Sequence, residues 1–104
     1  MSNKINVIVR GQSAIDAPSV FKTVVLKSGI AFADQVLQTD TKYVVRWNYD
    51  LKGRLVNIPA RCIFDFDGGR ISNGSIHWND TKIFNPYQYE ILNNITETGD
   101  KIIL

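Results

Sequence analysis

Apolar and polar side chains alternate along much of the stretch from residue 42 to residue 79, and this alternation constrains the fold more than any other feature of the chain. A period of two places successive side chains on opposite faces of a β-strand. Turn signals at 51–54 (LKGR) and 67–70 (DGGR) divide the stretch. They leave three runs rich in β-branched and aromatic residues: KYVVRWNYDL, LVNIPARCIFDF and RISNGSIHWN. We therefore predict an antiparallel meander of three strands.

The two faces of this predicted sheet differ in chemistry. The alternation places one apolar, partly aromatic set on one face: Tyr43, Val45, Trp47, Tyr49, Val56, Ile58, Ala60, Cys62, Phe64, Phe66, Ile76 and Trp78. The other face is mixed and carries Arg46, Asn48, Arg61 and His77. An apolar face of this kind is either closed core or the lining of a cavity, since a ligand cavity is an incompletely filled core.

Weaker signals lie on both sides of the meander. Residues 5–10 have the pattern of a short strand, and 30–37 are a second, weaker strand candidate. Asp16 and Pro18 fit the start of a helix that ends before Gly29, and Asn85 with Pro86 fits the start of another. No internal repeat is visible. The 104 residues predict a single domain, 1–104, whose last part, 84–104, is a helix and a tail.

Composition excludes several classes of function. Twelve basic and ten acidic residues give a net charge of +2, and their scatter along the chain predicts no nucleic-acid partner. Cys62 is the only cysteine and His77 the only histidine, so neither an internal disulfide nor a Cys/His metal site is expected. No apolar run approaches the roughly 20 residues of a membrane span. We expect a cytoplasmic protein without membrane contact, metal or cofactor.

The order of these motifs resembles the nuclear-transport-factor-2-like superfamily, in particular its SnoaL-like polyketide cyclase and ketosteroid isomerase branches. The resemblance covers about residues 5–83. Its carriers are VVRW at 44–47, KGRLVNIPARCIFDF at 52–66, DGGRI at 67–71 and SIHWND at 75–80. It implies an α+β fold in which a strongly curved, mostly antiparallel sheet forms a cone, with the helix of 16–28 on its concave side. An all-β sandwich is the alternative fold.

The chain departs from that family in two respects. The family opens with helices that close the cone, whereas Ile5 here already begins the first predicted strand. The uncovered apolar face leads us to expect a homodimer or a larger even oligomer. The family's catalytic acid falls on Cys62, a weak hydrogen-bond donor, and its bases fall on residues 7–9 or near Ile76, where no carboxylate stands. We assign no catalytic residues and incline against an enzyme.

The preferred function is therefore the binding of a small apolar molecule without the family's acid–base catalysis. The predicted ligand-binding set is Tyr43, Val45, Trp47, Tyr49, Ile58, Cys62, Phe64, Ile76 and Trp78. Two alternatives stay open. One is an isomerase, cyclase or hydratase acting on a small hydrophobic substrate, and the other is a protein-interaction domain that uses the exposed face of the sheet.

Three polar or reactive features have simpler interpretations beside the functional ones. Cys62 is interpreted as a small buried residue rather than a nucleophile. His77 with Arg46, Asn48 and Arg61 is compatible with an anion site, but a solvated or subunit-contacting face is preferred. DFDGG at 65–69 has acidic residues suited to calcium, yet it lacks the remaining ligands, so a hairpin turn is preferred.

Overall fold

The computed structural model describes residues 21–104, and nearly all of the regular structure in this range is β-strand. One helical turn interrupts the strands. The elements in chain order are β1 (Lys22–Val25), α2 (Phe32–Gln35), β2 (Thr41–Val45), β3 (Tyr49–Asp50), β4 (Leu55–Asn57), β5 (Ile63–Phe66), β6 (Ile71–Phe84) and β7 (Leu92–Ile103).

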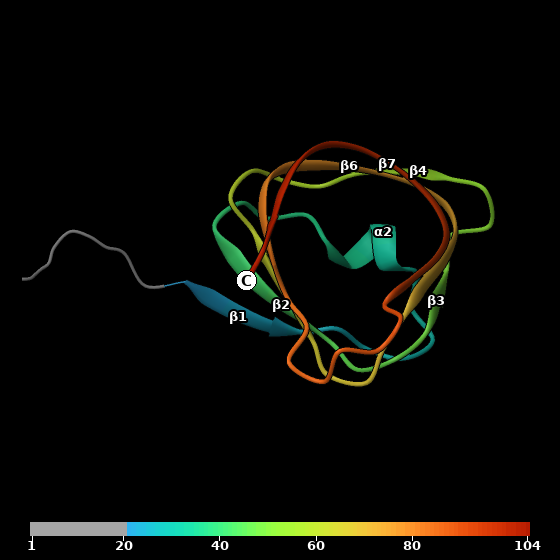
Figure 1. Cartoon of the computed structure of the whole chain (residues 1–104), viewed down its shortest axis with the longest axis horizontal. Helices are drawn as coiled ribbons and strands as arrows, with labels where there is room; N and C mark the ends of the chain where they lie inside the picture. Colours follow the sequence, from blue (N-terminus) through green and yellow to red (C-terminus); the bar gives the residue numbers. More distant parts are fainter. Residues whose placement is uncertain (1–20) are drawn as a thin grey trace, which may run out of the picture.

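Every strand pair in this sheet is parallel. The partners stand 19 to 22 positions apart, from Lys22 opposite Thr41 to Tyr49 opposite Ile71. Parallel pairing at an offset of about twenty residues means that the chain winds in coils and lays each coil on the one before. The fold is therefore a parallel β-solenoid, and Figure 1 looks down its stacked coils.

Each coil has three short faces. The first face holds β1, β2, β5 and the C-terminal parts of β6 and β7. The second face holds β3 and the N-terminal parts of β6 and β7. The third face holds β4 and the middle parts of β6 and β7. Residues with positive φ mark two of the corners in successive coils: Lys52, Asn73 and Asn94 at one, and Asp40, Arg61 and Asp80 at the other. Left-handed backbone turns the chain sharply there, which lets one long strand such as β6 cover all three faces.

Side chains from aligned positions fill the interior as columns. Tyr43 stands opposite Phe64, and Phe64 opposite Ile83. The Tyr43 and Phe64 rings stack with centroids 5.5 Å apart, and the Trp78 ring meets Phe64 edge-on at 5.9 Å. All four residues are at most 1% exposed. Such columns are the expected core of a solenoid, because each coil buries its apolar side against its neighbours.

The single turn of α2 closes the first end of this core. Figure 1 shows α2 inside the closed outline of the coils. Phe32 at its start is 2% exposed, and its ring lies 5.8 Å from Tyr49 and 5.9 Å from Phe64. Gln35 ties the turn to the loop before it by accepting from the Lys27 amide and donating to the Lys27 and Ile30 carbonyls.

The predicted α+β cone with an antiparallel sheet is wrong, and so is the all-β sandwich. The strands predicted at 42–79 exist, but 51–54 and 67–70 are corners that carry the chain to another face of the same coil, not hairpin turns. The run LVNIPARCIFDF is divided into β4 and β5 by the corner at Arg61 (φ 59°). Alternation identifies the buried side of a strand, but it carries no information about which strand lies alongside.

Several flanking elements are also corrected. Residues 22–25 form β1 rather than the end of a helix from Asp16 to Ser28; residues 16–20 and the predicted strand 5–10 lie outside the described residues. Phe32–Gln35 is helical within the weak strand candidate 30–37. Asn85 and Pro86 begin a loop, and the predicted helix and tail of 84–104 are mostly β7.

Candidate functional site

The nine residues predicted to bind a ligand belong almost entirely to the packed core. Eight of them are at most 6% exposed, and several contact one another directly, as the Tyr43–Phe64 and Phe64–Trp78 ring pairs show. Trp47 is the exception at 51% exposed, because the chain turns a corner between β2 and β3. Tyr49 alone among the nine lines the pocket described below. Whether any of them binds a ligand stays a prediction.

Cys62 is fully buried, as the simpler interpretation of this residue predicted. Its thiol lies 3.2 Å from the Gln38 carbonyl oxygen, and burial raises the pKa of the thiol. His77 is exposed and its Nδ1 lies 2.8 Å from the Thr98 hydroxyl. A buried thiol with a raised pKa is a poor nucleophile, so Cys62 acts as a packing residue.

The cationic residues named as an anion site each have a separate partner. Arg61 forms a two-pronged ion pair with Asp40, at 2.7 and 3.0 Å, and Arg46 pairs with Asp67 at 3.0 Å. Asp65 pairs with Lys42 at 3.7 Å. The acidic residues of DFDGG are thus engaged in ion pairs between neighbouring coils, and residues 21–104 contain no cluster of metal-ligating side chains.

The outer edge of β7 is the most extensive unpaired feature of the described chain. β7 has twelve residues and pairs along one edge with β6, while residues 21–104 supply no strand for its other edge. Backbone N–H and C=O groups along such an edge are free to pair with a further strand. Three large apolar residues beside it are exposed: Ile102, Ile103 and Leu104.

Alternate residues of β7 lie over the end of the core. Glu97 stands opposite buried Ile76, Lys101 opposite buried Thr81, and Ile103 opposite buried Ile83. Aligned residues in a parallel ladder share their orientation, so these three side chains point inward. Ile95, opposite Gly74, packs against the same core. The end face of the solenoid therefore combines apolar side chains with one acidic and one basic group.

Glu97 and Lys101 form an ion pair across this end face, directly over Trp78. The Trp78 indole N–H donates to the Glu97 carboxylate at 2.9 Å, and the Lys101 ammonium lies 5.7 Å from the centre of the indole ring. Burial raises the pKa of Glu97, but the hydrogen bonds from Lys101 and Trp78 and the charge of Lys101 outweigh it. The pKa of Glu97 consequently lies below its ordinary value.

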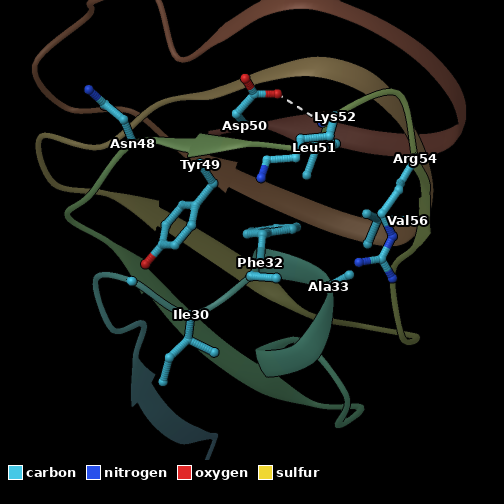
Figure 2. Close-up of a pocket in the computed structure, with 12 residues that line it drawn as sticks. Ile30, Phe32, Ala33, Asn48, Tyr49, Asp50, Leu51, Lys52, Arg54 and Val56 are labelled. Atoms are coloured by element: carbon cyan, nitrogen blue, oxygen red, sulfur yellow. Dashed lines mark hydrogen bonds between the residues drawn. The ribbon is translucent and has the colours of Figure 1, made fainter.

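A pocket of about 410 Å³ lies toward the other end, between residues 29–33 and residues 48–56. Figure 2 shows the Phe32 and Tyr49 rings at its floor. The Tyr49 hydroxyl donates to the Lys27 carbonyl at 2.8 Å, and burial raises the pKa of this phenol. Three charged residues, Asp50, Lys52 and Arg54, also belong to the lining.

Neither the β7 edge nor this pocket was predicted, although one sequence signal pointed to the coils. TDTK at 39–42, NDTK at 79–82 and GDK at 99–101 recur at the same corner in different coils. The expectation that the chain has no repeat is wrong for this reason. The coil between TDTK and NDTK lacks the motif, because Arg61 stands at the corner position that Asp40 and Asp80 occupy in the neighbouring coils.

Comparison with known proteins adds no relative: no family model matches the chain, and neither a curated protein nor a solved structure is a significant match. The described part of the chain contains no helix long and apolar enough to cross a membrane.

Proposed function

We propose that the chain is a protein-interaction module that adds a strand to the open edge of β7, and that the strand comes from a second copy of the same chain. Strand addition at a sheet edge supplies backbone hydrogen bonds for affinity and side-chain contacts for specificity. The preferred oligomer is a homodimer, in agreement with the expectation from the sequence. A cytoplasmic location, compatible with the one buried free thiol at Cys62, belongs to the same proposal.

The observation that carries the proposal is the self-complementary order of the inward residues of β7. Ile95, Glu97, Gly99, Lys101 and Ile103 stand at alternate positions around Gly99. When two copies pair antiparallel about a two-fold axis at Gly99, Glu97 stands opposite Lys101 of the second copy, and Ile95 opposite Ile103. Opposite charges at facing positions contribute about 0.2–1 kcal/mol each, and the symmetry provides two such pairs.

The same charges disfavour other partners. Inward-pointing charged residues at an edge deter an apolar strand from adding to it. Head-to-tail stacking of copies is also disfavoured, because Lys22 at one end of the coils and Lys101 at the other stand on the same face, opposite Thr41 and Thr81 respectively. Two ammonium groups would then meet at the junction. A closed two-fold dimer avoids this repulsion and pairs the β7 edges of the two copies with each other, so that neither of these edges stays open.

Charge reversal at the two positions tests the proposal. Glu97→Lys places lysine opposite lysine, and Lys101→Glu places glutamate opposite glutamate, so each variant alone is expected to sediment as a monomer. An equimolar mixture restores both opposite pairs and is expected to form a heterodimer. The double variant Glu97→Lys/Lys101→Glu is expected to be a homodimer. Sedimentation equilibrium at micromolar concentration measures all four cases.

The matched control is Lys27→Glu, which reverses an exposed charge just after β1, at the opposite end of the coils from β7, and should leave the dimer intact. Circular dichroism checks that each variant keeps its strand content. The proposal is overturned by a wild-type chain that remains monomeric, or by single variants that remain dimeric. It also fails if folded single variants do not associate when mixed.

A further inference from the structure

The pocket between residues 29–33 and 48–56 has the composition of a small-molecule site that is independent of the β7 edge. Its volume of about 410 Å³ lies within the range of about 300–1,000 Å³ that is usual for such sites. Its floor is apolar and aromatic, formed by Phe32, Tyr49, Leu51 and Val56, all at most 6% exposed. The loop of α2 and the second coil hold these side chains in place, so the floor is preformed.

The charged groups of the pocket have different orientations. Figure 2 shows the carboxylate of Asp50 turned away from Phe32, while the side chains of Lys52 and Arg54 extend toward the Phe32–Ala33 side. Asp50 accepts hydrogen bonds from the Lys52 amide at 2.8 Å and from the Asn73 side chain at 3.2 Å. Both of its oxygens thereby accept a hydrogen bond, one from the neighbouring backbone and one from a residue outside the pocket.

The two cations are not neutralised by the residues around them. Within residues 21–104 the ion pairs involve Lys42, Arg46, Arg61 and Lys101, and neither Lys52 nor Arg54 takes part in one. Their side chains also make no hydrogen bond to another described residue. An ammonium and a guanidinium that flank an apolar floor and form no ion pair with another described residue present a site for an anion carried on an apolar body.

We infer that this pocket binds a small amphipathic monocarboxylate, with its apolar part on Phe32 and Val56 and its carboxylate between Lys52 and Arg54. The fork of the Arg54 guanidinium matches a carboxylate in a two-pronged pair. The negative charge of Asp50 at the rim disfavours a doubly charged group such as phosphate. The site differs from the binding of a purely apolar molecule expected from the sequence, both in its residues and in its need for an anion.

Three probes separate the contribution of the two cations to binding from that of the apolar floor. They are 3-phenylpropionate, the uncharged 3-phenylpropanamide and inorganic phosphate. Each is titrated into the isotope-labelled full-length chain and followed by the backbone amide signals of Phe32, Tyr49 and Val56. The acid is expected to shift these signals and to bind more tightly than either other probe. Lys52→Ala and Arg54→Ala should each weaken its binding by about two- to fivefold, as expected for solvent-exposed ion pairs, and the double variant should weaken it further.

Lys82→Ala removes an exposed cation outside the pocket and should leave the affinity unchanged. Equal binding of the acid and the amide would contradict the role of the cations. Equal binding of phosphate and the acid would contradict the role of the apolar floor. Shifts confined to residues outside 29–33 and 48–56 would show that the site lies elsewhere. None of these outcomes bears on the β7 dimer, which is tested by oligomeric state.

Discussion

Gly99 lies at the corner of β7 through which the two-fold axis of the proposed dimer passes. Its φ is +82°, and a Cβ at this position would overlap the Trp78 carbonyl oxygen. Gly53 has a similar φ of +79° with open space around it. Gly53→Ala should therefore lower the free energy of unfolding by about 1–2 kcal/mol, the cost of a left-handed alanine. Gly99→Ala should lower it distinctly more, and urea denaturation of both variants measures the difference. Equal losses would contradict the close approach of Gly99 to Trp78.

Glu97 should make stability depend on acid pH. Because its pKa in the folded chain lies below the ordinary value, its contribution is present above the unfolded-state pKa and is lost as the pH falls through the folded one. Glu97→Gln removes this titration. The difference in unfolding free energy between wild type and variant should shrink from neutral to acid pH in urea titrations. A difference that stays constant would mean that Glu97 is not held ionised by Lys101 and Trp78.

At the scale of elements, α2 is the closure of the core rather than a helix with stability of its own. One turn is too short to be stable alone, so its position depends on Phe32 between the Tyr49 and Phe64 rings. Phe32→Ala should cost about 3–5 kcal/mol, as expected for a truncated core phenylalanine. Leu37→Ala, at a residue 70% exposed just after α2, should change stability by less than about 0.5 kcal/mol. Chemical denaturation of the two variants provides the comparison, and similar losses would contradict the capping role.

The elements also show which part of the fold the sequence could predict. Alternation correctly predicted that Val56, Ile58, Cys62 and Phe64 face the core, because a strand's inward side is a local property. It failed at Trp47, where a corner breaks the period. The helix expected from Asp16 to Ser28 rested on capping residues and an apolar stripe, but Lys22–Val25 pairs with β2 instead. Tertiary pairing outweighed the local helical signal.

At the scale of the whole molecule, the direction of strand pairing was the decisive error. Glycines at 53 and 68–69 are compatible with hairpins, and local sequence does not distinguish a hairpin from a corner of a coil. The recurrence of Asp-Thr-Lys at 40–42 and 80–82 does distinguish them, since a repeat of this kind predicts stacked coils. The β7 edge and the pocket both arise from that stacking, which is why neither could be predicted from a meander.

The arrangement of coils is the claim on which the dimer and the pocket both depend, and nuclear Overhauser contacts between backbone protons test it most directly. The parallel solenoid predicts contacts between the backbones of Tyr43 and Phe64, of Phe64 and Ile83, and of Val56 and Ile76. Each of these pairs is separated by about one coil in the sequence. Contacts mirrored about 51–54 and 67–70, joining successive strands antiparallel, would contradict the solenoid and with it the open edge of β7.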